Sequence, residues 1–498
     1  MTATIEANLP VFVVIMPLFV AFILPTLARR IRLVEGLVIA TAVLGLMGAG
    51  YLASEVLIRN GNPISYSMGG WPASWGIQLS VGNLSCLFLL MVASVSLPVS
   101  LFASDNMTRE VGGPQRTTRF YALCLLLGGA LAGMAMTADL FNVFVLVEVA
   151  TLSCCGLVCS RNHPRAAEAA FNYLILATLG SALILGGIGF LYMITGYLNM
   201  GCAFQELNRV WQDYPHVVWI AASFFLVGFG VKSALFPLHV WLPDAHSEAP
   251  SPASAILSGL AVKGYAICLI KVLYNVFGIT LLQDLGMDRI LTLMGMIAII
   301  AGSVFALTQD ELKRRLAFST VAQVGYVFLG LGIANSESLT GTLFHMASHA
   351  VIKSGLFLAA GAIIASTGKS RISEMAGVGK KMPITMGVFT ICSMSLVGIP
   401  LFSGFIGKWN LLLGSVEAGN SLAQVVIIAG SVLCAAYLFP VIRVAYFEPS
   451  PAADWQDPGL PQKTALVMLA AWVMILGVVP GPFLQLAKRA AVDLLAVK

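Results

Sequence analysis

The chain has 498 residues, of which 58% are hydrophobic and only 10% are charged. Soluble globular proteins carry about 25% charged residues, so the composition excludes a soluble protein and indicates an integral membrane protein. The formal net charge of +5 comes with no basic, aromatic-interleaved patch of the kind that binds nucleic acid.

Apolar stretches of about 20 residues, the length that spans a bilayer core, follow one another along the chain. We expect an all-α polytopic membrane protein with about 14 transmembrane helices. The predicted spans are 9–27, 34–53, 80–103, 117–137, 138–158, 165–196, 217–242, 253–277, 288–308, 315–334, 339–366, 384–413, 421–446 and 464–484. The first span has neither a basic region before it nor a small-residue cleavage site, so we expect a retained helix rather than a signal peptide. The polar gaps 54–79 and 197–216 are too short to form an independent core.

The lysines and arginines are distributed unevenly between the predicted loops. If the N-terminus lies outside the cytoplasm, 17 of the 28 fall in the inner loops and six on the outer side. The six are Arg59, Arg209, Arg289, Lys488, Arg489 and Lys498. This asymmetry follows the positive-inside rule, and it predicts that both termini lie on the non-cytoplasmic side.

Several ionisable residues remain within the predicted helices. They are Glu148, Lys232, Lys263, Lys271, Lys353 and Lys408. Each such group at the membrane centre costs about 2.5 to 3.5 kcal/mol, so the set is hard to explain as an accident. Lys271 lies near the end of its helix, where its side chain can reach the interface, and we expect it to be structural. Glu148 lies about 10 residues, or ~15 Å, into its helix, which is too deep for that. A structural ion pair of Glu148 with one lysine would leave the other lysines unexplained. We therefore expect a functional role for Glu148, Lys232, Lys263 and Lys408.

His345, His349 and Lys353 are spaced i, i+4 and i+8, so they lie along one face of a helix. Two histidines at i, i+4 can bind a metal, but an ammonium group repels a cation and no carboxylate or cysteine stands nearby in sequence. We expect a polar stripe that relays protons, with helix packing as the alternative, and no metal site. The nine cysteines form no C-x-x-C run, so we expect apolar core residues and no cofactor in this chain.

Two predicted spans contain prolines close to a buried lysine. The stretch "VKSALFPLHVWLPDAH" places Lys232 five residues before Pro237, and "VGIPLFSGFIGKWN" places Pro400 and Gly404 before Lys408. Proline removes a backbone donor and breaks a helix. Irregular backbone at membrane depth is tolerated only where protein or water satisfies it. Because transporters build ion sites from broken helices, both breaks are candidate sites.

The order of the spans predicts two inverted five-helix repeats, each with a broken helix in fourth place. Because five is odd, the second set enters the membrane from the opposite face. We expect N-terminal helices 1 to 3 in 1–116, the first repeat (helices 4 to 8) in 117–277, the inverted second repeat (helices 9 to 13) in 288–446, and helix 14 with a tail in 447–498.

The stretch "KSALFPLHVWLPDAHSEAPSPASAILSGLAVKGYA" resembles the signature of the proton-translocating antiporter-like subunits. This family is shared by respiratory complex I, membrane-bound hydrogenases and Mrp-type Na+/H+ antiporters. The segments "LKRRLAFSTVAQVGY", "HMASHAVIKSGLFLAAG" and "GIPLFSGFIGKW" resemble further family segments in the expected order, so the likeness covers most of residues 117–410. The stretch "GGWPASWGIQL" and the lysine at position 408 are more similar to the MrpD-type antiporter members and the hydrogenase-type members.

The resemblance implies a proton pathway in the first half of the chain. Glu148 matches the family's glutamate in the fifth helix, and Lys232 matches the lysine of the broken seventh helix with which it pairs. Lys263 matches the lysine of the eighth helix at the centre of the path.

In the second half, His345 and His349 match the family's histidines between the two halves, with Lys353 one turn further along. Lys408 matches the twelfth-helix position near the proton exit. Because the chain stops at Lys498, short of the extension found in distal members, we expect a medial module.

The resemblance implies a non-redox, ion-translocating subunit of a multi-subunit complex in a prokaryotic cytoplasmic membrane. The expected complex is a complex I-like or membrane-bound hydrogenase-type redox complex, and an Mrp-type Na+/H+ antiporter is the alternative. The partners would be other hydrophobic subunits and a peripheral redox module with iron–sulfur clusters, flavin or nickel–iron. The transported ion would be H+ or Na+. A small-solute carrier and a membrane scaffold are less favoured, because the buried polar residues are mostly titratable and would cost too much in a scaffold.

Overall fold

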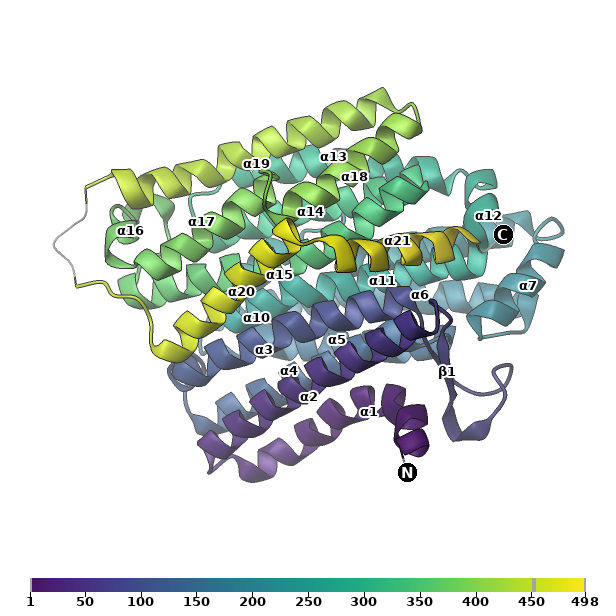
Figure 1. Cartoon of the computed structure of the whole chain (residues 1–498), viewed down its shortest axis with the longest axis horizontal. Coiled ribbons are helices and arrows are strands. Elements are labelled where there is room, and N and C mark those ends of the chain that lie inside the picture. Colours follow the sequence, from purple (N-terminus) through teal and green to yellow (C-terminus); the bar gives the residue numbers. More distant parts are fainter. Residues whose placement is uncertain (1, 450–453, 497–498) are drawn as a thin grey trace.

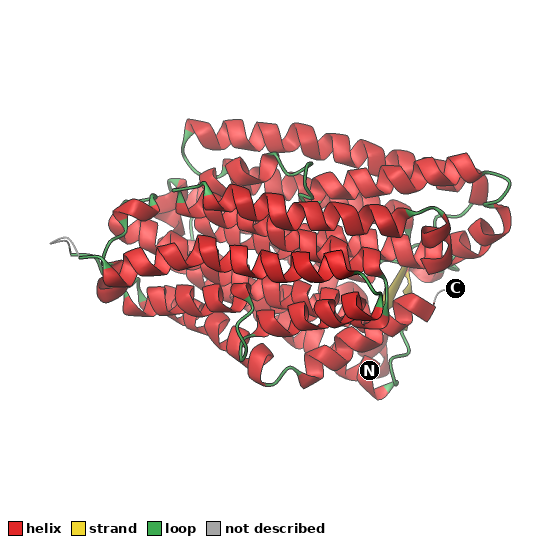
Figure 2. Cartoon of the chain, turned by 90° about the horizontal axis from the view of Figure 1, so that it is seen from above, coloured by secondary structure: helices red, strands yellow, loops and turns green. Residues whose placement is uncertain are grey.

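The computed structural model describes residues 2–449 and 454–496, and most of them are helical (Figure 1). Lys498, which the sequence assigns to the outer side, lies outside the described residues. The long helices run side by side, and loops connect them at the two ends of the bundle (Figure 2). In the described residues, 13 helices are long and apolar enough to cross a membrane. The chain is therefore a polytopic integral membrane protein.

Three long helices and one hairpin form the N-terminal part. The helices are α1 (Thr2–Ile23), α2 (Ile31–Ile58) and α3 (Asn83–Val111). Strands β1 (Ile64–Ser67) and β2 (Gln78–Val81) pair in antiparallel orientation between α2 and α3. Figure 1 shows β1 at the same end of the bundle as the C-terminus.

The middle part alternates long helices with short ones. It contains α4 (Pro114–Met136), α5 (Leu140–Cys159), α6 (Pro164–Thr195), α7 (Met200–Val210), α8 (Pro215–Lys232), α9 (Trp241–Glu248), α10 (Ser251–Ile256), α11 (Val262–Val272) and α12 (Gly278–Asp284). Two π-helical turns, Leu257–Ala261 and Leu273–Phe277, join the last three into one continuous membrane span.

The last part contains α13 (Met287–Leu307), α14 (Leu312–Ile333), α15 (Ser336–Thr367), α16 (Val378–Lys381), α17 (Pro383–Val397), α18 (Ser403–Glu417), α19 (Ser421–Phe447), α20 (Leu460–Val478) and α21 (Gly481–Ala496). For the C-terminal region the sequence predicts one helix and a tail. The structure instead has two helices, and α21 packs against α3 and α15.

Local backbone chemistry explains where two of the helices end. α8 ends at Lys232, and in the connection to α9 the non-glycine residue Ala234 has a φ of 57°. α17 ends before Gly398, whose φ is 96°, and Pro400 follows two residues later. A left-handed glycine followed by a proline is a common helix terminus. The predicted span 384–413 is thus divided into two helices of 15 residues each. This division explains why 13 rather than about 14 helices are long enough to span the membrane.

Helix α15 forms the centre of the core (Figure 1). Each residue from Ser338 to Ile363 is buried, and the helix contacts α3, α10, α14, α17, α18, α20 and α21. A Cβ atom added at Gly341 would lie 2.6 Å from the backbone nitrogen of Leu411 on α18. The glycine therefore allows α15 and α18 to pack closely, and α15 carries its polar face into the interior.

Candidate functional site

The interior of the bundle contains several lysines that are almost completely shielded. Their exposed fractions are 1% for Lys232, 2% for Lys263, 6% for Lys271, 0% for Lys353 and 5% for Lys408. Because an ammonium group without partners is very costly in a low-dielectric interior, the acceptors around each lysine decide what the site can do.

Lys232, the last residue of α8, meets Glu148 on α5. Its Nζ lies 3.5 Å from Glu148 Oε1 and donates to Thr151 Oγ1 at 2.5 Å. Ser181 on α6 also donates a hydrogen bond to Glu148. The Lys232 side chain is fully buried, whereas the Glu148 side chain is 32% exposed at the surface of the chain. The structure therefore forms the expected ion pair with an acid that is partly accessible and an amine that is not.

Two glycines let α6 and α8 pack closely beside Lys232. A Cβ atom added at Gly228 on α8 would lie 2.8 Å from the carbonyl oxygen of Gly180 on α6. Added at Gly180, it would lie 3.5 Å from Cε of Lys232. Small residues let membrane helices approach closely. The contact between α6 and α8 therefore lies directly beside Lys232.

Lys263 lies in the first turn of α11, directly after a π-helical turn. It donates to the carbonyl oxygen of Ser258, a residue of that turn. The Ser258 hydroxyl is 2.8 Å from the Thr320 hydroxyl on α14. Two residues after Lys263, the Tyr265 ring lies 5.7 Å from Lys232 Nζ. Lys263 therefore stands between the ion pair and α14, at a π-helical turn of the kind often found at functional sites.

The two histidines of α15 stack on one another. The ring centroids of His345 and His349 are 5.6 Å apart, and the ring planes differ by 5°. The Tyr326 ring on α14 lies 5.5 Å from the His345 ring. Both histidines and Gln323 are buried, and none of their side-chain polar atoms has a hydrogen-bond partner in the described residues. Buried polar atoms normally have partners, so this region is suited to hold water.

Lys353 and Lys408 follow on either side of the histidines. Lys353 donates to the Leu316 carbonyl at 2.6 Å and to the Ser319 hydroxyl, both on α14. Lys408 donates to the carbonyl oxygens of Leu396 at 2.8 Å and Val397 at 3.1 Å.

The acceptors of Lys408 are the last carbonyls of α17, which have no partner within that helix. Lys408 Nζ also lies 4.8 Å from the centre of the Tyr326 ring. Tyr326 therefore contacts both His345 and Lys408, and the helix end near Pro400 and Gly404 supplies the acceptors for the amine.

His246 on α9 is an ionisable residue that the sequence analysis did not select. It is fully buried, and neither ring nitrogen has a partner in the described part of the chain. Its ring lies 4.8 Å from the Phe357 ring, which in turn lies 5.7 Å from Lys353 Nζ. The sequence could have indicated His246 by its position after Pro237, at the end of the stretch "VKSALFPLHVWLPDAH".

A second group of ionisable residues lies at the start of α14. Lys313, which the sequence assigns to a loop, is only 4% exposed and donates to the Ala249 carbonyl at 3.0 Å. Arg314 pairs with Asp244 at 3.0 Å. Burial, together with the nearby Glu248, raises the pKa of Glu311 above its usual value. Lys313 thus lies on α14 rather than in the loop before it, and the carbonyl that follows α9 accepts its hydrogen bond.

Lys271 also differs from its predicted position. We expected its side chain to reach the membrane interface, but α11 continues through a π-helical turn into α12, and Lys271 is buried. Its Nζ donates to the carbonyl oxygens of Met134 at 3.3 Å, Ala135 at 3.1 Å and Thr137. This lysine is therefore another buried amine, and carbonyls at the end of α4 accept its hydrogen bonds.

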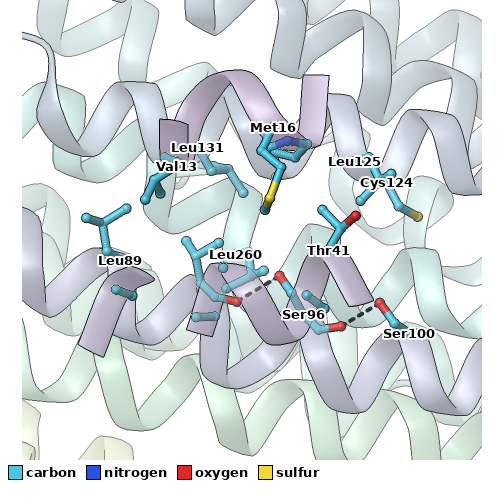
Figure 3. Close-up of a pocket in the computed structure, with 18 of the residues that line it drawn as sticks. Val13, Met16, Thr41, Leu89, Ser96, Ser100, Cys124, Leu125, Leu131 and Leu260 are labelled. Atoms are coloured by element: carbon cyan, nitrogen blue, oxygen red, sulfur yellow. Dashed lines mark hydrogen bonds between the residues drawn. The ribbon is translucent and has the colours of Figure 1, made fainter. Parts of the chain in front are cut away.

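An apolar pocket between α1, α2, α3 and α4 is shown in Figure 3. Its wall includes Val13, Met16, Leu89, Leu125, Leu131 and Leu260. The hydroxyls of Thr41, Ser96 and Ser100 donate to carbonyls of their own helices at 2.8 Å. With these hydroxyls already used, the pocket suits an apolar occupant better than an ion. Elsewhere in the described residues, no group of three or more His, Cys, Asp or Glu is arranged to hold a metal ion.

The fold and the interior define a class of protein: a polytopic α-helical membrane protein with a series of buried amines and imidazoles. Residues 137–434 match the family model described as "NADH:quinone oxidoreductase/Mrp antiporter, TM". The match extends from before Glu148 to beyond Lys408 and includes the expected site residues between them. The chain belongs to this family.

Two relatives and one solved structure are similar over almost the whole chain. NADH-quinone oxidoreductase subunit N of Desulforudis audaxviator is 39% identical over 460 residues, covering 91% of this chain and 89% of the relative. The putative antiporter subunit mnhD2 of Staphylococcus haemolyticus is 30% identical over 478 residues, covering 95% and 93%. A chain in the membrane-bound sulfane sulfur reductase, an archaeal respiratory membrane complex, superposes with a TM-score of 0.90 at 30% identity, covering 98% of both chains.

Proposed function

We propose that the chain is a proton-translocating, antiporter-like membrane subunit of a multi-subunit complex. The place that we favour for it is the ion-pumping module of a complex I-like or membrane-bound hydrogenase-type redox complex. The chain itself carries out no redox chemistry in this proposal, and any iron–sulfur clusters, flavin or nickel–iron belong to partner subunits.

The observation that carries the proposal is the sequence of polar contacts across the interior. At one end, Lys232 pairs with Glu148 and faces Tyr265. At the other end, the stacked histidines contact Tyr326, which contacts Lys408. Lys263 stands between these two groups. Ionisable groups at membrane depth are typical of ion pathways.

The ion pair supplies a way to move the proton. A carboxylate 3.5 Å from Lys232 Nζ stabilises the ammonium form of the lysine. If Glu148 and Lys232 separate, the ammonium loses this attraction and can pass its proton toward Lys263. The proton then continues through Lys353, His349 and His345 to Lys408.

The proposal includes the predicted architecture. The regions 117–277 and 288–446 are the two inverted five-helix repeats, between helices 1 to 3 in 1–116 and the C-terminal region 447–498. The broken helices are α8 with α9, at Pro237, and α17 with α18, at Pro400 and Gly404. Both termini lie on the non-cytoplasmic side of a prokaryotic cytoplasmic membrane, as the basic loops indicate. Other hydrophobic subunits and a peripheral redox module are the partners.

An MrpD-like role in an Mrp-type Na+/H+ antiporter is the second candidate. It is supported by the 30% identity to the putative antiporter subunit mnhD2. We favour the redox complex because the oxidoreductase subunit N is more similar, at 39% identity.

Proton transport by the native assembly in sealed vesicles tests the proposal. Lys232→Ala removes the amine that Glu148 stabilises, and we expect proton translocation to fall at least ten-fold. Lys488→Ala, at an exposed position on α21, is the control and should transport normally. Full transport by an assembled Lys232→Ala variant would exclude this function.

A further inference from the structure

A polar chamber of about 590 Å³ lies at the end of the bundle where β1, β2 and α21 meet. Its wall is formed by segments from six parts of the chain. The central series of amines, which comprises Lys232, Lys263, Lys353 and Lys408, does not line it. The polar side chains of the wall include Asn83, Ser85, Thr137, Asn199, Asn275 and Asp493. Lys271 also lines this chamber, and the function proposed above does not use it.

The surroundings of Lys271 are built for a protonated amine. Its Nζ donates to the carbonyl oxygens of Met134, Ala135 and Thr137. These three carbonyls belong to the C-terminal end of α4, where they have no partner within the helix and where the helix dipole favours a positive charge. Three acceptors match the three N–H groups of an ammonium.

The chamber also contains a buried acceptor without a partner. Asn83 is 1% exposed, and its Nδ2 donates to Asp493 Oδ2 on α21 at 2.8 Å. Its Oδ1 has no hydrogen-bond partner in the described residues. Because water occupies about 30 Å³ per molecule and fills polar cavities, a chamber of about 590 Å³ has room for roughly 20 waters.

The charges restrict what the chamber can bind. Asp493 is the single carboxylate among the lining residues, and the ammonium of Lys271 opposes a metal cation. An anion would find the three N–H groups of Lys271 already used by carbonyls. Water and the proton that it carries remain as the fitting occupants.

We propose that this chamber is an aqueous proton terminal and that Lys271 is its proton-binding group. The inference rests on the proposed function, and it adds Lys271 and a polar chamber to the central series. Lys271 follows Lys263 by eight residues on the same face of the helix, a rise of about 12 Å. Neutral Lys271 takes a proton arriving by way of water from the central series, and its ammonium gives that proton to water in the chamber. The reverse order applies to uptake.

The test is proton translocation by the native assembly with substitutions at Lys271. Lys271→Gln and Lys271→Cys should each lower the rate at least ten-fold while the partner subunits still copurify. Treatment of the Lys271→Cys variant with 2-aminoethyl methanethiosulfonate attaches an amine and should restore at least half of the rate. Methyl methanethiosulfonate attaches no amine and should restore none. Wild-type protein given both reagents controls for the native cysteines.

The outcomes separate this inference from the proposed function. Wild-type transport by Lys271→Gln, or equal restoration by both reagents, overturns the role of Lys271. If Lys232→Ala is inactive in the same assay, the proposed function survives that result. If Lys232→Ala is fully active, the proposed function itself fails.

A labelling experiment tests the chamber even if substitutions at Lys271 prevent assembly. Asn275→Cys places a thiol on the chamber wall, and a charged, membrane-impermeant thiol reagent should modify it in the intact assembly. Ser100→Cys, in the apolar pocket of Figure 3, is the control and should stay unmodified. Protection of Asn275→Cys from the reagent would overturn the aqueous chamber.

Discussion

Backbone carbonyls at helix ends hold several of the buried amines. Lys408 uses the last carbonyls of α17, Lys271 uses those of α4, and Lys313 uses Ala249 just after α9. A helix end leaves carbonyls without intrahelical partners, and these carbonyls offset much of the desolvation of an ammonium. In the span that contains Pro400 and Lys408, the helix break therefore supplies the free carbonyls that accept the hydrogen bonds of the lysine.

The carboxylate of the ion pair can be tested by Glu148→Gln. The substitution keeps the size and removes the charge that stabilises the ammonium of Lys232. We expect proton translocation to fall about five- to ten-fold, or about 1 to 1.4 kcal/mol, measured as acidification of sealed vesicles. Glu168→Gln, at an exposed position on α6, is the control. Equal rates for the two variants would contradict a role for the ion pair.

The contact of Tyr326 with Lys408 leads to a second residue-scale prediction. The ring lies 4.8 Å from Lys408 Nζ, while the hydroxyl donates to the Ile427 carbonyl at 3.2 Å. A cation over an aromatic face gains about 2 kcal/mol when desolvated. Tyr326→Phe keeps this face and should retain most of the transport rate, whereas Tyr326→Leu should lower it about ten-fold. A loss of similar size in Tyr326→Phe would assign the role to the hydroxyl instead.

At the scale of elements, the packing of α15 against α18 positions His345 relative to Lys408. A Cβ atom added at Gly407 would lie 2.8 Å from Cα of His345, so Gly407→Ala must push the helices apart. We expect a loss of about 1 to 3 kcal/mol in stability, seen as a lower Tm in detergent, together with slower transport. Gly387→Ala on α17 has open space around its Cβ and should leave both unchanged. An unchanged Tm for Gly407→Ala would contradict the close contact.

The sequence predicts most membrane-spanning elements, because each needs only a local run of apolar residues. The contact between Glu148 and Lys232 was expected from the resemblance to the antiporter-like family, because the residues alone did not decide which lysine pairs with Glu148. Tyr326 could not be found in this way, since a buried tyrosine looks like any other core residue before α14, α15 and α18 are packed together. The burial of Lys271 depends on α4 and the length of α12, which no local pattern near the lysine reveals.

At the scale of the whole molecule, the surface indicates that the chain does not act alone. The Glu148 side chain is 32% exposed on the side of a membrane-spanning helix. An acid that faces lipid there would cost several kcal/mol, so we expect a neighbouring subunit to cover it. Such a neighbour would also be in position to change the distance between Glu148 and Lys232.

Purification of the native assembly through a tag on this chain tests that expectation. In mild detergent we expect several hydrophobic subunits to copurify, identified by mass spectrometry, together with iron, flavin or nickel from a redox module. Hydrophobic partners without any redox metal would instead support the Na+/H+ antiporter.

Cross-linking from a photoreactive residue at Val145, an exposed position one helical turn before Glu148, should capture a membrane subunit. A control residue at Val240, exposed between α8 and α9, should not capture the same subunit. A chain that purifies alone and transports protons alone would show that Glu148 needs no neighbour, and the energy for separating the ion pair would then have to come from an ion gradient acting on this chain directly.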